Sequence, residues 1–178
     1  ATSTVLTEPA AITSAIDAST NVTCFSGNDG MASVLAGGGS SPYAYSWSSA
    51  GTNSIENSLT AGTYTVTVTD NNGCSTTTDV TITEPSQVTA AISASTDASC
   101  NGQTDGSATV LAGGGVGSYG YLWSSGGNGA TENNLGAGTY TVTVTDGNSC
   151  SQTTTVTIGS PCLLNLLDRK STRLNSSH

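Results

Sequence analysis

The residues best suited to covalent chemistry are four cysteines that form two pairs with the same spacing. Cys24 precedes Cys74 by 50 residues, and Cys100 precedes Cys150 by 50 residues. A fixed spacing in a chain with only 8% charged residues is typical of disulfides in a secreted protein. A zinc site needs four ligands, and no histidine accompanies either pair. A redox pair usually has the form Cys-x-x-Cys, which this sequence lacks. We therefore expect the disulfides Cys24–Cys74 and Cys100–Cys150.

Carboxylate and amide side chains near these cysteines form a candidate metal site. If each disulfide forms, the loops around its two cysteines lie together, and their oxygen atoms could bind Ca²⁺. The alternative is that these residues hydrogen-bond the backbone of their own turns. Two or three such ligands in each half of the chain are fewer than the six to eight that Ca²⁺ takes. No other cofactor is expected. The candidate ligands are Asp29, Asp70, Asn72, Asp105, Asp146 and Asn148.

Groups that could catalyse a reaction are scarce. Residues 1–167 contain no Lys, Arg or His that could activate a serine or threonine nucleophile. Glu56 and Glu132 each stand alone, whereas glycosidases use a pair of carboxyl groups. We expect no enzyme activity and predict no catalytic residue.

The charge distribution excludes two kinds of partner. Residues 1–167 carry eleven carboxylates and no basic residue, and the whole chain has a formal net charge of -9. Nucleic acid is excluded because this stretch offers no cation to the phosphates, and an anionic membrane surface would repel it. No apolar run approaches the ~20 residues that span a bilayer, so membrane insertion is not expected.

A 76-residue repeat organises the chain. Residues 10–85 align without a gap with residues 86–161, and 44 of the 76 positions are identical. Residues 1–9 resemble the end of a preceding, truncated repeat, so we interpret the chain as an interior fragment. The repeat stops after Pro161, and we expect residues 162–178 to be an unstructured tail, with no role predicted for Cys162. Residues 168–178 are similar to the translation of a sequencing adapter and are interpreted as an artefact.

The elements that must position these residues are short β-strands. The decapeptide AGTYTVTVTD occurs at residues 61–70 and again at 137–146, and it alternates with the period of two of a half-buried strand. Glycine-rich turns separate it from other short strand-like runs. Six or seven antiparallel strands in 76 residues predict an all-β fold of tandem, small immunoglobulin-like β-sandwich domains. In the first repeat the other runs cover 11–19, 31–36, 43–47, 54–59 and 79–85.

Four aromatic residues are expected to form the structural core. Trp47 and Trp123 occupy the position at which a central-strand tryptophan pins the two sheets of such a sandwich. Tyr64 and Tyr140 follow a tight Ala-Gly turn, which predicts a tyrosine corner, although a plain core tyrosine is the alternative.

A row of threonines alternates with these core positions. Thr63, Thr65, Thr67 and Thr69 would present hydroxyl and methyl groups at strand spacing, and such a row could contact polysaccharide. The alternative is that threonine is used here for its β-propensity on a solvated face.

The order of these landmarks resembles the SprB-type repeat, a family named after a very large surface adhesin of gliding bacteria. The landmarks are Cys-x4-Asp-Gly, a GGG loop, Tyr-x-Tyr-x-Trp, Leu-x-AGTYTVTVTD, the second cysteine and VTITEP, and the resemblance covers residues 10–161. It implies an extracellular array at the bacterial cell surface, exported by the type IX secretion system.

Three functions are compatible with this resemblance. The first is multivalent adhesion to a surface polysaccharide or to another cell-surface or substratum ligand. Gliding motility is one process that such adhesion would serve. The alternatives are a passive stalk that presents another domain of a secreted protein, and a carbohydrate- or Ca²⁺-binding module.

Overall fold

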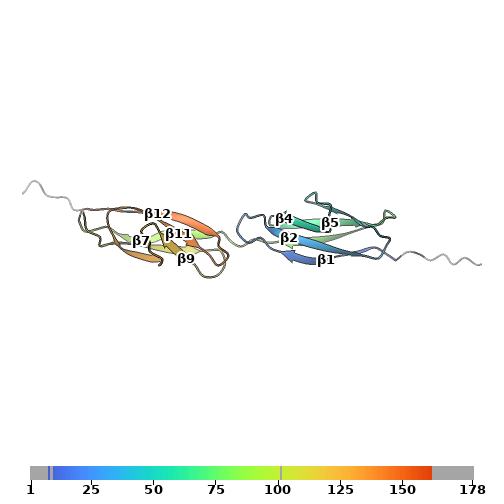
Figure 1. Cartoon of the computed structure of the whole chain (residues 1–178), viewed down its shortest axis with the longest axis horizontal. Coiled ribbons are helices and arrows are strands. Elements are labelled where there is room, and N and C mark those ends of the chain that lie inside the picture. The colour runs from blue at the N-terminus through green and yellow to red at the C-terminus, as the bar shows by residue number, and fades with distance from the viewer. Residues whose placement is uncertain (1–7, 9, 101, 162–178) are drawn as a thin grey trace, which may run out of the picture. The chain divides into compact units, whose positions relative to one another are not determined.

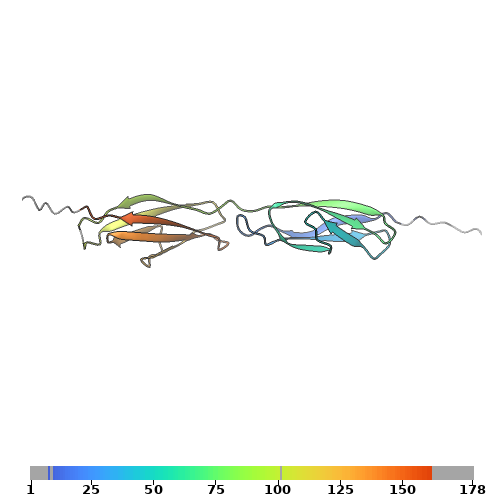
Figure 2. The same cartoon turned by 90° about the horizontal axis from the view of Figure 1, so that it is seen from above.

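The computed structural model describes residues 8, 10–100 and 102–161. The expected partial repeat at 1–9, apart from Glu8, and the tail at 162–178 lie outside the described residues. The chain divides into two compact units, and each is described by itself (Figure 1, Figure 2). One comprises Ala1–Gln87 with Gly114–Gly117, and the other comprises Val88–Gly113 with Ser118–His178.

The first repeat forms two three-stranded antiparallel sheets. One has the order β1-β2-β4 and the other has the order β3-β5-β6. Most strands lie within one or two residues of the predicted runs, but the last begins four residues earlier than its apolar alternation indicates. The strands are β1 (Thr13–Thr20), β2 (Gly30–Gly37), β3 (Ala44–Trp47), β4 (Ile55–Leu59), β5 (Gly62–Thr69) and β6 (Ser75–Ile82).

The second repeat has the same architecture. Its sheets have the orders β7-β8-β10 and β9-β11-β12, and its strands match those of the first repeat in length. The prediction of an all-β, immunoglobulin-like fold is confirmed. The strands are β7 (Thr89–Thr96), β8 (Gly106–Gly113), β9 (Gly120–Trp123), β10 (Thr131–Leu135), β11 (Gly138–Thr145) and β12 (Ser151–Ile158).

The repeated decapeptide supplies the central strand of one sheet in each repeat. In β5, Val66 and Val68 are fully buried, and the residues between and beside them are partly or fully exposed. This strand pairs with β6 from Gly62 opposite Ile82 to Thr69 opposite Ser75. Strict alternation places every valine on the face that the other sheet covers, so the core is built by period-two patterning.

Each core contains one tryptophan whose polar atom is satisfied. Trp47 is 3% exposed, and its indole Nε1 donates a hydrogen bond to the Asn53 carbonyl at 2.8 Å. Trp123 is 1% exposed and donates in the same way to the Gly129 carbonyl at 2.8 Å. Burial of the indole therefore leaves no unpaired N–H, which would be costly.

A tyrosine corner closes the turn before the central strand. The Tyr64 hydroxyl donates to the Thr60 carbonyl at 3.0 Å, and the Tyr140 hydroxyl donates to the Gly136 carbonyl at 3.1 Å. The bond reaches back four residues, so it holds the Ala-Gly turn against the start of β5 or β11.

Packing explains the glycine of the Asp-Gly dipeptide at the start of β2. A Cβ atom on Gly30 would lie 2.8 Å from Ile82 Cγ2 and 2.8 Å from the Leu59 carbonyl oxygen. The strand needs glycine here because the neighbouring backbone and the core isoleucine occupy the space of a side chain.

Candidate functional site

Each repeat has two ends, and its two cysteines lie at different ones. We call the end where the chain enters the repeat the leading end, and the end where it leaves the trailing end. Cys24 lies in the loop between β1 and β2 at the trailing end, where the Val22 N–H donates to the Thr83 carbonyl at 3.0 Å. In the same loop the Ser26 N–H donates to the Glu84 carboxylate.

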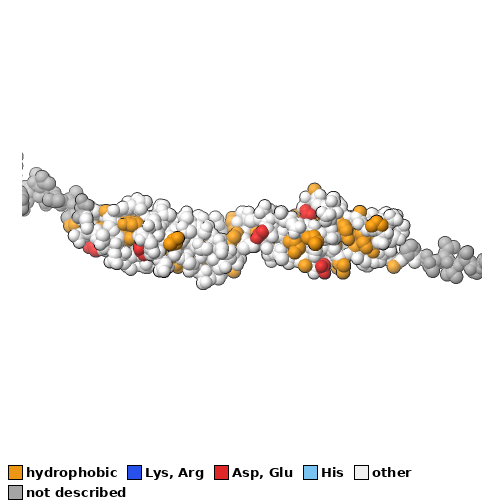
Figure 3. Space-filling view, in the orientation of Figure 1, with side chains coloured by type: hydrophobic (Ala, Val, Ile, Leu, Met, Phe, Trp, Pro, Cys, Tyr) orange, Lys and Arg blue, Asp and Glu red, His pale blue; other side chains and the backbone are white. Residues whose placement is uncertain are grey.

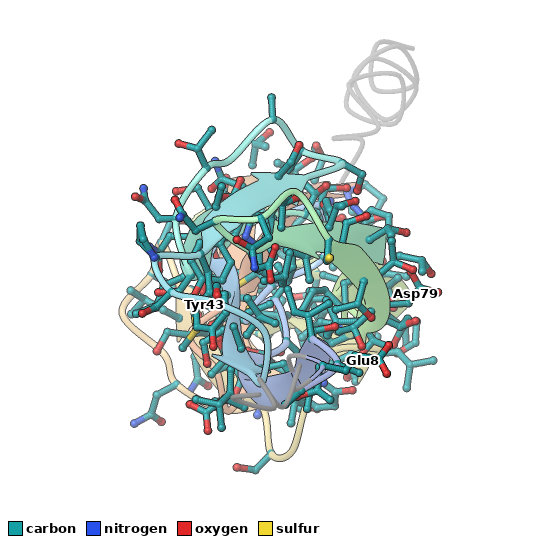
Figure 4. All side chains as sticks on the ribbon, turned by 90° about the vertical axis from the view of Figure 1, so that its right-hand side faces the viewer. Glu8, Tyr43 and Asp79 are labelled. Carbon is teal, nitrogen blue, oxygen red and sulfur yellow. The ribbon has the colours of Figure 1, made fainter. Side chains whose placement is uncertain are left out.

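Cys74 lies at the leading end, in the loop between β5 and β6. The Asn71 N–H in this loop donates to the Ser40 carbonyl at 2.9 Å, and the neighbouring Gly39 N–H donates to the Ala10 carbonyl at 2.8 Å. Figure 4 looks onto this end, with Tyr43 and Asp79 on opposite sides of it.

The predicted Cys24–Cys74 disulfide is therefore wrong. The strand β2 connects the two ends, and its eight residues span about 23 Å at ~3.3 Å per residue. A disulfide needs Cα atoms roughly 4.4–6.8 Å apart. Cys74 is a free, exposed thiol, whereas Cys24 is disulfide-bonded.

The predicted Cys100–Cys150 disulfide is wrong for the same reason. Cys150 directly precedes β12, and Cys100 lies beyond the other end of this strand, where the Ala98 N–H donates to the Gly159 carbonyl at 3.1 Å. Both cysteines are disulfide-bonded, but the eight residues of β12 separate them. Each must therefore have a different partner.

Strand direction explains the separation. Four strands lie between Cys24 and Cys74, and an up-and-down order would return the chain to the same end. However, β3 runs antiparallel to β5 in one sheet, and β4 runs antiparallel to β2 in the other. Both β3 and β4 therefore run towards the trailing end, and the chain crosses the length of the repeat three times instead of four.

The carboxylate of Asp70 organises the loop that leads to Cys74. This side chain is 6% exposed. Its Oδ1 accepts from the N–H groups of Asn72 at 2.9 Å and Cys74 at 2.8 Å, and its Oδ2 accepts from the Ser40 N–H at 3.0 Å. The Ser40 amide, with further loop amides, lowers the pKa of Asp70, because donors to a carboxylate favour its charged form.

The GGG loop makes room for this carboxylate. Gly39 has a positive φ of 54°, and a Cβ atom on it would lie 2.6 Å from Asp70 Oδ2. Sequence reasoning missed Ser40 and Gly39 as partners of Asp70. The three consecutive glycines were the available signal, since they indicate that another chain segment approaches the backbone closely.

The second repeat reproduces the arrangement. Asp146 is 6% exposed, and its Oδ1 accepts from the N–H groups of Asn148 and Cys150 at 2.9 Å each. In both loops the aspartate hydrogen-bonds the backbone of its own turn, which is the alternative to Ca²⁺ binding given above.

The predicted Ca²⁺ ligands are not brought together. Asp29 lies at the trailing end, where its Oδ1 accepts from the Thr23 N–H at 2.9 Å, far from Asp70. Asp105 accepts from the Ser99 N–H at 2.9 Å in the equivalent loop. Within residues 8, 10–100 and 102–161, no three His, Cys, Asp or Glu side chains gather as a metal centre.

These two trailing-end carboxylates also cap their loops. Hydrogen bonds from the Thr23 hydroxyl and N–H lower the pKa of Asp29, and the Ser99 N–H lowers the pKa of Asp105. The carboxylates predicted as metal ligands therefore act as loop acceptors in this structure.

The lone glutamates brace the loop between β3 and β4 and its equivalent. Glu56 accepts from the Ser49 hydroxyl at 2.7 Å, and Glu132 accepts from the Ser125 hydroxyl at 2.7 Å. A Cβ atom on Gly51 would lie 1.7 Å from Glu56 Oε2, so the glutamate packs directly onto glycine. Both glutamates therefore have a structural role in these loops.

The threonine rows are cross-strand ladders on an exposed face. The Thr63 and Thr81 hydroxyls are 3.2 Å apart, and the Thr65 hydroxyl donates to Asp79 at 2.6 Å. The Thr139 and Thr157 hydroxyls repeat the first contact at 3.2 Å.

The described surface carries acidic side chains and no basic one. Figure 3 shows acidic groups scattered among polar and apolar side chains. No basic group lies among the described residues, because every Lys, Arg and His of the chain lies at 169–178. Large exposed apolar residues recur in the two repeats, with Leu35 and Leu111 each 65% exposed. In the described ranges no helix is long and apolar enough to cross a membrane.

The family model described as the SprB repeat matches residues 16–52 and 92–128, two segments exactly one repeat length apart. The chain contains two SprB repeats. Each SprB match begins in the first strand of a repeat and ends just after the tryptophan strand.

No curated protein matches the chain. Several solved structures are similar. The C-terminal 282-residue fragment of intimin, solved with the intimin-binding domain of the translocated intimin receptor, shares 15% identity at a TM-score of 0.42. The alignment covers 85% of this chain, which spans 64% of the length of that fragment.

Two further structures have lower TM-scores. The fibronectin(III)-like modules of Clostridium thermocellum CbhA share 13% identity at a TM-score of 0.36, over 83% of this chain and 94% of theirs. Domains 4 and 5 of the S-layer protein SbsC share 15% identity at 0.30, over 86% of this chain and 100% of theirs.

Proposed function

We propose that this chain is an extracellular segment of a large bacterial cell-surface adhesin, in which SprB repeats adhere by adding many weak contacts. The observation that carries the proposal is the duplication of the exposed surface together with the core. The threonine ladder and the exposed leucine occur at equivalent positions in both repeats. Identical weak sites on one chain raise avidity without any new contact.

The chemistry of the surface favours an uncharged ligand. The described residues offer hydroxyl, amide and carboxylate groups and no cation, so an anionic polymer would be repelled. A neutral surface polysaccharide offers hydroxyl groups that can exchange hydrogen bonds with the threonine ladders. The finer assignment, to a gliding-motility adhesin exported by type IX secretion, belongs to the same proposal and is supported by the SprB match.

Retention on a polysaccharide-coated surface tests adhesion. Beads would carry the chain at increasing density over a layer of neutral polysaccharide, with a layer of anionic polysaccharide for comparison. Multivalent adhesion predicts retention that rises more steeply than in proportion to density, on the neutral layer only. Equal, negligible retention at every density would contradict adhesion and support a passive spacer.

The two sheets offer matched variants for the same assay. Thr63→Val with Thr139→Val removes the same hydroxyl from both repeats and keeps a β-branched side chain. Leu35→Thr with Leu111→Thr changes the other sheet of each repeat equally. Adhesion through the threonine ladder predicts weaker retention for the first pair alone, whereas equal retention for both pairs would exclude the ladder as the contact.

A further inference from the structure

A shallow groove lies on the exposed threonine face of the second repeat. It has a volume of about 290 Å³ and is lined by Leu122, Trp123, Ser124, Thr141 and Thr143. All five belong to β9, to β11 or to the turn that follows β9, so the groove lies within a single repeat. Its volume is close to the lower end of the ~300–1,000 Å³ range of small-ligand pockets, which suits a weakly bound, partly covered ligand.

Strand pairing places the lining side chains together. Leu122 lies opposite Thr143 in the ladder between β9 and β11, and side chains that lie opposite each other share one face of a sheet. The Ser124 N–H donates to the Thr141 carbonyl at 2.9 Å, and the Thr141 N–H donates to the Ser124 hydroxyl at 3.1 Å. These two bonds hold the turn after β9 against β11, so the groove is preformed.

Leu122 is the residue that distinguishes this groove from its equivalent in the first repeat. It is 63% exposed although it is apolar, and it lies on β9, an edge strand of its sheet. The equivalent residue of the first repeat is Ser46, in β3. The fold does not require leucine here, because β3 forms the same strand with serine.

A second difference between the repeats removes a charge from the same face. In the first repeat Asp79 lies opposite Thr65 and accepts a hydrogen bond from its hydroxyl at 2.6 Å. In the second repeat Thr155 lies opposite Thr141. A threonine cannot hold this hydroxyl by a charge-assisted bond, so the Thr141 hydroxyl is more easily redirected towards a ligand.

An apolar side chain beside uncharged hydroxyls matches the surface of a neutral sugar ring. One face of a β-linked glucose unit carries C–H groups that can cover Leu122, and its ring hydroxyls can exchange hydrogen bonds with Thr141 and Thr143. Small-ligand pockets commonly combine apolar contact with a few polar groups that fix orientation. The five lining residues are uncharged, so a phosphorylated or carboxylated sugar would find no cation in the groove.

Two other occupants fit less well. An added peptide strand needs a row of open backbone groups, but β9 has only four residues, and its Trp123 N–H already donates to the Gly127 carbonyl at 2.9 Å. A second copy of the chain would bring two acidic surfaces together, since residues 1–167 carry eleven carboxylates and no basic residue.

We propose that this groove is a subsite for one ring of a neutral, β-linked polysaccharide, and that Ser46 and Asp79 weaken the equivalent place in the first repeat. The subsite rests on the adhesion to neutral polysaccharide proposed above, and it locates one contact of that adhesion. Repeats with the same core then differ in sugar binding through two exposed positions, those of Leu122 and Thr155.

Leucine-methyl NMR of the whole chain tests the subsite. The chain, with isotope-labelled leucine methyl groups, would be titrated with cellohexaose, a soluble neutral β-linked glucan. The Leu122 signals are identified by their absence from the spectrum of Leu122→Ser. The proposal predicts a saturable shift of the Leu122 signals and none for Leu35 and Leu111, which are each 65% exposed on the other sheet. Equal shifts of all three leucines, or no Leu122 shift at millimolar sugar, would overturn it.

Exchanging the two positions between the repeats provides matched controls. Thr155→Asp should weaken the binding read at Leu122 several-fold, because the new carboxylate would hold the Thr141 hydroxyl. Ser46→Leu with Asp79→Thr should give new leucine signals that shift over the same range of sugar concentration. These substituted positions are exposed, so the variants should fold, and the dispersion of the core leucine signals checks this. Unchanged binding by Thr155→Asp, or new signals that ignore the sugar, would overturn the proposal.

The subsite and the proposed adhesion can fail separately. A chain that is retained on beads but shows no Leu122 shift keeps the adhesion and loses the subsite. A Leu122 shift without retention keeps the subsite and loses multivalent adhesion. An oligogalacturonate of the same length should leave the Leu122 signals in place, and a shift equal to that with cellohexaose would contradict a neutral subsite. Leu122 signals that move with chain concentration in the absence of sugar would identify a second copy as the occupant and overturn the proposal.

Discussion

Replacing Ile82 by alanine removes three carbon atoms from the core of the first repeat. Ile82 is 1% exposed, and its Cγ2 fills the space above Gly30. At ~0.8 kcal/mol per buried methylene, the transfer term is about 2.4 kcal/mol, and the residual cavity raises the expected loss to about 2–5 kcal/mol. A domain of this size has a total stability of roughly 4–11 kcal/mol, so the loss is a large fraction of it.

The chain provides a matched control at Ile55. This side chain is 50% exposed, and the equivalent position of the second repeat, Thr131, carries threonine naturally. Ile55→Thr should therefore change the free energy of unfolding by less than about 1 kcal/mol.

Urea denaturation with tryptophan fluorescence measures both variants. In a Trp123→Phe background, Trp47 alone reports on the first repeat. A loss below about 1 kcal/mol for Ile82→Ala, or equal losses for Ile82→Ala and Ile55→Thr, would refute the assignment of Ile82 to the core.

Three other outcomes are expected. Tyr140→Phe should cost about 0.5–1.5 kcal/mol in urea denaturation, because one hydrogen bond of the tyrosine corner is lost; an unchanged midpoint would contradict the corner. The pKa of Asp70 is lowered in the folded state by backbone amides, so its contribution is present above the unfolded pKa near 3.8 and is lost as pH falls through the folded pKa. Asp70→Asn should lower the thermal midpoint at pH 7 and flatten its decline below pH 4, and parallel pH curves would argue against this. Gly51→Ala should destabilise the first repeat and be partly rescued by Glu56→Ala, since the new Cβ would overlap the carboxylate; no rescue in thermal unfolding would mean that other atoms cause the strain.

The strands could be predicted because the sequence alternates where one face is buried. Val66 and Val68 alternate with threonine throughout β5, and period-two patterning fixes both the strand and its buried face. The start of β6 was missed because its first residues, from Ser75, are all polar. Pairing with β5 extends β6 to Ser75 opposite Thr69, and such pairing is a tertiary effect with no local signal.

The cysteine pairing could not be predicted from spacing. The predicted pairing is wrong because the chain passes from one sheet to the other between β3 and β4, and these two strands therefore run in the same direction. The predicted metal site depended on the same pairing, so Asp29 and Asp70 lie apart for the same reason. The burial of Asp70 depends on Gly39 and Ser40, which are about 30 residues away in the sequence and are brought close only by the fold.

The opposite positions of the chain ends in each repeat have a mechanical consequence. In the first repeat, β1 begins at the leading end, with Thr13 opposite Gly37, and β6 finishes at the trailing end, with Ile82 opposite Gly62. Tension along the chain therefore slides β1 past β2 and β6 past β5, and the rungs of each ladder bear the load together. A hairpin pulled open from one end instead loses its rungs one at a time. Each repeat is thus loaded in shear, and its unfolding rate under force sets how long the fold withstands a steady pull.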